Sequence, residues 1–137
     1  MPQDRASGAE AAAYGREMGR ALAHLLGAKL LKRGSNEVVW QERCAVIKSC
    51  RQANTSFGIT ATMLARLEVA LVAIEGHGGA YNVYELPIER FRRGMRDSLS
   101  GGGDGRVKLL PRSEAEHHGR PVASFSHAEI EAARARG

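Results

Sequence analysis

The most apolar run in the chain, residues 59–76 (ITATMLARLEVALVAIEG), constrains the fold most, because so much apolar surface has to be buried. Its only charged residues are Arg66, Glu68 and Glu75, and Gly76 follows where a helix C-cap is typically found. We therefore predict a largely buried helix over this run. The run is too short and too often interrupted to cross a bilayer, so no membrane association is expected.

A long amphipathic helix is predicted near the N-terminus. Ser7 followed by Glu10 matches a capping box, and Gly34 is placed to end the helix. One apolar stripe recurs mostly at steps of three and four residues: Tyr14, Met18, Leu22, Leu25, Leu26 and Leu30. Three basic residues fall in the last turns, where cations favour the helix dipole: Lys29, Lys32 and Arg33.

Two short segments, EVVW (37–40) and CAVIKSC (44–50), predict an antiparallel hairpin around QER. Because side chains alternate along a strand, Cys44, Val46 and Lys48 are expected on one face of it. AYNVYEL (80–86) predicts a further strand, with Tyr81 and Val83 on one face together with Glu85.

The last third of the chain predicts shorter elements. Pro87 is expected to start a short helix whose apolar positions are Ile88, Phe91, Met95 and Leu99. RVKLL (106–110) and PVASF (121–125) predict a final pair of strands joined by a polar segment. SHAEIEAARAR (126–136) predicts a terminal helix with Ser126 and Glu129 as its capping box.

Together these elements predict a single domain over residues 1–137, of the α+β (mixed α/β) class. We expect a small central sheet, mostly antiparallel or mixed, between the long N-terminal helix and the buried second helix. Residues 98–105 (SLSGGGDG) are expected to form a flexible loop, and the ends, residues 1–6 and 127–137, to fray.

Composition excludes several classes of protein. An apolar content of 43% is too high for a disordered chain. Two cysteines, Cys44 and Cys50, are too few for a disulfide framework, so a reducing, cytoplasmic setting is expected. His77, His117 and His118 have no spacing that fixes a metal site, and no metal ligand is assigned.

The formal net charge of +5 is concentrated in two parts of the sequence. One is residues 29–51, which include Lys48 and Arg51, and the other is a run of four arginines: Arg90, Arg92, Arg93 and Arg96. Such clusters form either an electrostatic footprint for phosphates or an ordinary solvated face.

The stretch SNEVVWQERCAVIKSC (35–50), with the order of the elements around it, resembles the PD-(D/E)XK nuclease superfamily, the restriction-endonuclease-like fold. The resemblance covers roughly residues 8–86. That fold has a helix, a run of strands ending in an E-x-K strand, a second helix and another strand. It implies that Lys48, near the end of an apolar strand, is the lysine of the motif.

Nucleases of this kind hold one or two divalent cations between an aspartate and a glutamate, while the lysine helps to orient or activate the attacking water. Here Asn36 or Glu37 stands where the aspartate is expected, and Val46 stands where the motif needs glutamate. Other carboxylates are available as substitutes: Glu42, Glu68 and Glu75. The candidate catalytic residues are therefore Lys48, Glu37 and Glu42, with Mg²⁺ as a cofactor only in an active nuclease.

Three functions follow. The first is a nuclease-like nucleic-acid-binding module, of the kind that the resemblance implies in bacteria, phages and plasmids, without metal-dependent cleavage and without a cofactor. It would contact phosphates regardless of sequence through Lys48, Arg51 and the four arginines of residues 90–96. The alternatives are a protein-interaction or assembly module, as a homodimer or a subunit, and an active Mg²⁺-dependent endonuclease whose carboxylates have moved.

Overall fold

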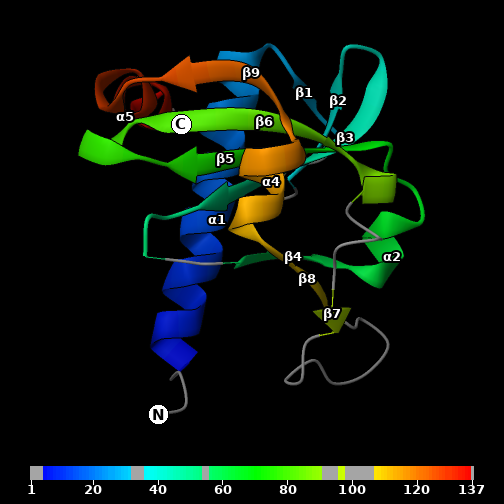
Figure 1. The fold of residues 1–137 in the computed structure, drawn as a ribbon. Helices are drawn as coiled ribbons and strands as arrows, with labels where there is room; N and C mark the ends of the chain where they lie inside the picture. Colours follow the sequence, from blue (N-terminus) through cyan, green and yellow to red (C-terminus); the bar gives the residue numbers. More distant parts are fainter. Residues whose placement is uncertain (1–4, 32–35, 54–55, 91–95, 98–106, 137) are drawn as a thin grey trace.

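The computed structural model describes the whole chain except residues 1–4, 32–35, 54–55, 91–95, 98–106 and 137. It has the predicted α+β class, with a mixed sheet and a long N-terminal helix (Figure 1). The main sheet has the strand order β1-β2-β3-β5-β6-β9, and a smaller sheet has the order β4-β8-β7. Strands β3 and β5 are parallel, and the other described pairs are antiparallel.

The strands of the main sheet are β1 (Lys29–Leu30), β2 (Glu37–Trp40), β3 (Arg43–Cys50), β5 (Val69–Glu75), β6 (Tyr81–Pro87) and β9 (Arg120–Phe125). Those of the small sheet are β4 (Ser56–Thr60), β7 (Arg96–Asp97) and β8 (Val107–Pro111). The helices are α1 (Arg5–Leu26), α2 (Ala61–Leu64), α4 (Arg112–His118) and α5 (His127–Ala135), with a 3₁₀ turn η1 (His77–Gly79). None of the helices in the described part of the chain is long and apolar enough to span a membrane.

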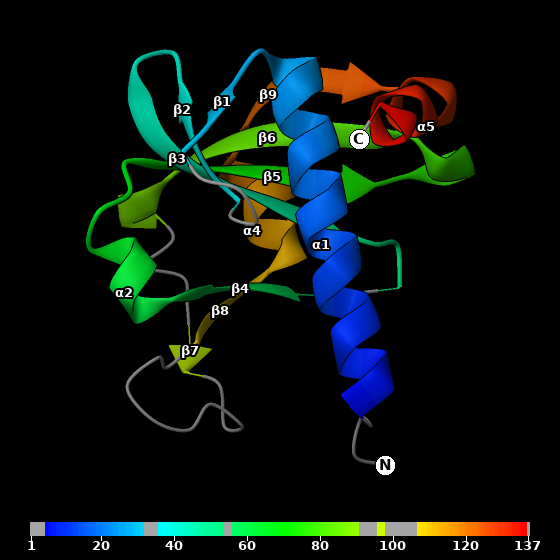
Figure 2. The same cartoon turned by 180° about the vertical axis from the view of Figure 1, so that it is seen from behind.

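The main sheet has an apolar cluster on each face. On one face, α1 lies across the strands and places Met18 and Leu22 against Ile47 (Figure 2). On the other face, Val46 belongs to a cluster that also contains Ile59 of β4 and Ala115 of α4. This division confirms the predicted alternation along β3, and Tyr81, Val83 and Glu85 of β6 are likewise all buried.

Helix α1 begins and ends earlier than predicted. It starts at Arg5, two residues before the expected cap Ser7, and it ends at Leu26. Gly27 has φ +70°, and the N–H groups of Gly27 and Ala28 donate to the carbonyls of His24 and Ala23. This is a Schellman motif, which needs a left-handed residue that glycine adopts without strain.

Of the basic residues expected in the last turns of α1, Lys29 is therefore not helical. Lys29 and Leu30 form β1, which pairs with Val38 and Val39 of β2. Lys32, Arg33 and Gly34 lie outside the described residues. The dipole argument was wrong for Lys29, because α1 already ends at Leu26.

The predicted buried helix over residues 59–76 is also wrong. Its first two residues end β4, α2 is a single turn, and the apolar VALVAIE forms the central strand β5. Strand β5 is buried on both faces between β3 and β6, so its apolar residues run continuously instead of alternating. A short continuous run has no periodicity that separates such a strand from a buried helix.

The final strands exist, but they do not pair with each other. β8 joins β4 and β7 in the small sheet, whereas β9 joins β6 at the edge of the main sheet. The polar segment between them is the helix α4. The helix expected after Pro87 is present over residues 88–90, and its continuation over 91–95, like the loop expected at 98–105, lies outside the described residues.

Helix α5 has the predicted capping box, with hydrogen bonds in both directions between Ser126 and Glu129. It buries Ile130 and Ala133 and lies beside the C-terminal half of α1 (Figure 2). Arg134 of α5 contacts Glu17 of α1 at 2.9 Å, and Arg20 of α1 donates to the carbonyl of Arg134. These contacts position α1 across the sheet.

Candidate nucleic-acid interface

Among the described residues, the second half of β3 has no partner strand on one side. Strand β2 pairs with residues 43–46 only, and the last bond on this side runs from the Ile47 N–H to the Asn36 carbonyl at 2.9 Å. Because N–H groups two residues apart point the same way along a strand, the Ser49 N–H points to this same side. No strand pairs there in the part of the chain that the structure describes.

A groove of about 290 Å³ lies along this open edge, between α1 and β4. Its lining comes from α1, from the residue before β2, from β3 and from β4: Gly15, Arg16, Asn36, Lys48, Ser49, Ser56, Phe57 and Gly58. None of these side chains is acidic, two are cationic, and three carry an amide or a hydroxyl group. The groove is therefore suited to an anion.

Lys48 is the most unusual group in the groove. Its side chain is partly buried, and that burial lowers the pKa of Lys48 below its usual value. It has no hydrogen bond or ion pair within the described residues, although a buried charge is normally paired. A bound anion would compensate for the lost hydration of the ammonium group.

The apolar replacement Lys48→Met should therefore stabilise the protein by about 1 kcal/mol, because it removes a desolvated charge and keeps most of the side-chain volume. Urea denaturation at pH 7 would measure the difference. A matched control is Lys29→Met on β1, where the lysine is exposed and little change is expected. Destabilisation by Lys48→Met would show that the ammonium group has a structural partner.

Asn36 is one of the two residues, with Glu37, that stand where the resemblance places an aspartate, and it brings no negative charge to the groove. Its side chain packs closely against α1, where a Cβ added at Gly19 would lie 2.3 Å from the Asn36 Oδ1. This Oδ1 is buried and has no hydrogen-bond partner in the described structure. Gly19 is therefore needed for the close approach of Asn36 to the helix.

The candidate carboxylates do not assemble around Lys48. Glu37 binds Arg66 through both oxygens, at 2.7 and 2.9 Å. Glu42 lies in the β2–β3 turn with φ 64°, six residues from Lys48, which is roughly 20 Å along a strand. Val46 is fully buried.

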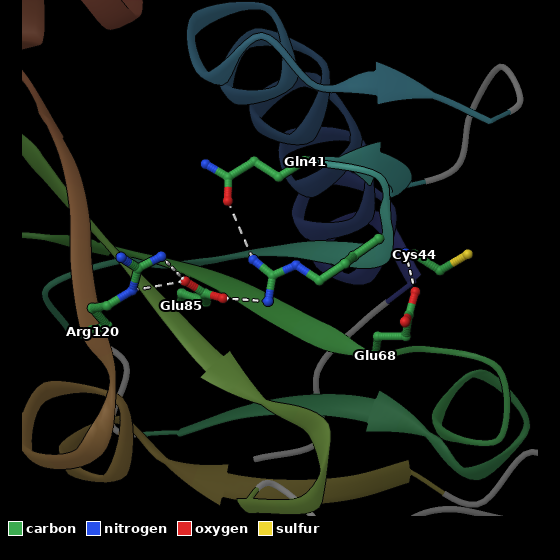
Figure 3. Close-up of polar contacts among 6 residues, drawn as sticks. Gln41, Cys44, Glu68, Glu85 and Arg120 are labelled. Carbon is green, nitrogen blue, oxygen red and sulfur yellow. Dashed lines mark hydrogen bonds and ion pairs between the residues drawn. The ribbon is translucent and has the colours of Figure 1, made fainter.

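The two other carboxylates that were considered accept hydrogen bonds from backbone N–H groups. Glu68 accepts a hydrogen bond from the Cys44 N–H at 2.8 Å (Figure 3), and Glu75 accepts one from the Gln52 N–H at 3.0 Å. Among the described residues, no group of three or more histidine, cysteine or acidic side chains could hold a metal ion.

The predicted arginines have different surroundings. Arg51 follows β3 and its guanidinium carbon lies 3.6 Å from the centre of the Tyr14 ring. Arg90 forms an ion pair with Glu114 at 3.4 Å. Arg92 and Arg93 lie outside the described residues, and of Arg96 only the backbone, in β7, is described.

Sequence reasoning missed Arg16, which is exposed and lines the groove from α1. The signal was present in GREMG, where Gly15 and Gly19 mark one side of the helix as a place of close approach. A Cβ added at Gly15 would meet no atom within 4 Å, which shows that this glycine borders open space.

A second charged cluster includes Arg43 at the start of β3, whereas the groove lies near the end of that strand. Glu85 of β6 is buried and accepts hydrogen bonds from Arg120, and its other oxygen lies 2.5 Å from Arg43 (Figure 3). Burial alone would raise the pKa of Glu85, but the hydrogen bonds from Arg120 and Arg43 outweigh it and lower the pKa. The carboxylate is neutralised by its neighbours, so this cluster holds strands β3, β6 and β9 together.

Neither a family model nor a curated protein matches the chain. The fold is similar to a solved structure of Hjc, a Holliday junction resolvase from Archaeoglobus fulgidus, with a TM-score of 0.45 and 13% sequence identity. The similarity covers 80% of this chain and 93% of that chain.

Proposed function

We propose that this protein binds nucleic acid through phosphate contacts in the Lys48 groove, and that it does so without metal-dependent cleavage. The observation that carries the proposal is a partly buried lysine that has no hydrogen bond or ion pair among the described residues, in a groove whose lining has no acidic side chain. Lys48 and Arg16 supply the charge in the groove, and Arg51 adds a third cation next to the end of β3.

Phosphate fits the remaining groups of the groove. Its oxygens accept hydrogen bonds, and the groove offers hydroxyl donors from Ser49 and Ser56 together with the Ser49 N–H. Gly15 and Gly58 leave the walls without side chains, so a backbone phosphate can approach closely. These contacts read no base, and binding independent of sequence is therefore expected.

The proposal is tested by fluorescence anisotropy with labelled DNA over a salt series. We expect dissociation constants on the order of 10⁻⁶ to 10⁻⁴ M, which rise log-linearly with salt as counterions are released. Lys48→Met should weaken binding about tenfold and reduce the salt slope by about one, as the loss of one phosphate contact does.

Lys29→Met is the matched control, because it removes the same charge from β1 at the edge of the main sheet, outside the groove. It should leave the affinity nearly unchanged. Equal losses in the two variants would mean that only net charge matters, and this would overturn the groove as the site. No binding at low salt would reject the function and favour a protein-interaction module.

A further inference from the structure

Arg51 lies over the ring of Tyr14. Its guanidinium carbon is 3.6 Å from the ring centre, which is a close cation–π contact. This contact restrains an otherwise flexible planar cation.

Tyr14 is itself fixed from the side of the core. Its hydroxyl lies 2.5 Å from the hydroxyl of Tyr81, a residue of β6 that is 2% exposed. Burial and this hydrogen bond raise the pKa of Tyr81, so its hydroxyl stays protonated. The Tyr14 ring is thus a rigid support under Arg51.

Arg51 is exposed, and it has no hydrogen bond or ion pair with an acidic side chain in the described part of the chain. It lies three residues beyond Lys48, which is roughly 10 Å along an extended chain. A planar cation with a free face is a surface on which a nucleobase can stack.

We propose that the Arg51–Tyr14 pair is a stacking platform for an unpaired nucleobase, so that the Lys48 groove binds single-stranded nucleic acid in preference to duplex. The inference rests on the proposed function, since Lys48 has to hold the phosphate backbone beside the platform. In a duplex both faces of each base are covered by its neighbours, whereas a single strand or a flap offers a free face.

The deciding variant is Arg51→Lys, which keeps the positive charge and removes the planar guanidinium group. Anisotropy with an oligonucleotide in single-stranded form and as a duplex, at one salt concentration, should show tighter binding of the single strand by the wild type. Arg51→Lys should weaken single-strand binding about tenfold, the effect of losing one stacked base, and leave duplex binding nearly unchanged.

Tyr14 provides a second, matched pair of variants. Tyr14→Phe keeps the ring and loses only the hydroxyl contact with Tyr81, so it should retain the preference for single strands. Tyr14→Leu removes the ring and should lose that preference as Arg51→Lys does. Circular dichroism of each variant would confirm that it is folded, and 2-aminopurine in the strand should be quenched on binding to the wild type and not to Arg51→Lys.

The outcomes separate this inference from the proposed function. Equal affinity for single strand and duplex, or an Arg51→Lys variant that binds the single strand as the wild type does, would overturn the platform and leave the phosphate groove standing. If Arg51→Lys weakened duplex and single-strand binding to the same extent, Arg51 would have no specific role in stacking on a base. This result would also overturn the platform. If neither form of DNA binds the wild type, both proposals fall.

Discussion

Replacing Val46 with glutamate should destabilise the protein by about 4 kcal/mol, because it would bury a carboxylate without hydrogen-bond donors. Val46 is 0% exposed and belongs to the apolar cluster with Phe57 and Ile59. The variant places a glutamate where the E-x-K pattern predicted from the sequence would need one, at a position that is part of the core. Urea denaturation at pH 7 measures the loss.

The defect of Val46→Glu should depend on pH. Burial raises the pKa of such a glutamate in the folded state above its unfolded value of about 4.3, so the folded state binds more protons over that interval. Stability should therefore fall as pH rises from about 4 towards 7, relative to the wild type. Val46→Ala is the control, since it removes packing without adding a charge and should show a deficit that does not change with pH. A Val46→Glu protein as stable as the wild type at pH 7 would show that the position is open to water.

Replacing Glu85 with glutamine should cost about 2 kcal/mol, since charge-assisted hydrogen bonds to the carboxylate are lost. Glu85 is 8% exposed and lies between Arg43 and Arg120, which would then face each other without the negative charge between them. Both arginines are partly exposed, with side-chain exposures of 35% and 66%, so the cost stays below that of breaking a fully buried pair. Thermal and urea unfolding at pH 7 would measure the change.

The pH dependence of Glu85→Gln has the opposite sign to that of Val46→Glu. The pKa of Glu85 is lowered in the folded state, so its contribution is fully present above the unfolded value of about 4.3 and is lost as pH falls through the folded value. The difference in the free energy of unfolding between the wild type and Glu85→Gln should therefore become smaller below about pH 4. Glu116→Gln is a matched control, because Glu116 is exposed and has one ion pair, with Arg112 at 3.5 Å, and little change is expected. A gap that persists unchanged in acid would contradict the role of the Glu85 charge.

The elements that were predicted correctly have local sequence patterns that are typical of only one kind of secondary structure. The β2–β3 hairpin and β6 alternate between faces, and the capping box of Ser126 and Glu129 lies entirely within five residues. Strand β5 could not be recognised in this way, since a strand covered on both sides has lost its alternation. The end of α1 was misplaced because Gly27 and Gly34 are equally good caps in the sequence, and only the pairing of Lys29 with β2 decides between them.

The site was predictable only in part. Lys48 was predicted on the strand where the structure has it, because it lies in the stretch 35–50, whereas Arg51 was included for its place in the basic cluster of residues 29–51. The walls of the groove come from Arg16 on α1 and from Ser56 and Gly58 on β4, segments that tertiary packing alone brings to β3. In the same way, no spacing in the sequence indicates that Arg66 engages Glu37 across 29 residues.

The open edge of β3 has a consequence for solubility. Unpaired strand edges recruit further strands, from the same protein or from others, and chains usually protect them with charge or cover. In the described structure the edge at Ser49 is recessed between α1 and β4, with Lys48 beside it, so a narrow ligand can enter while a second sheet cannot align along the strand. The recess in which we propose that a phosphate binds thus also keeps this edge from acting as a template for aggregation.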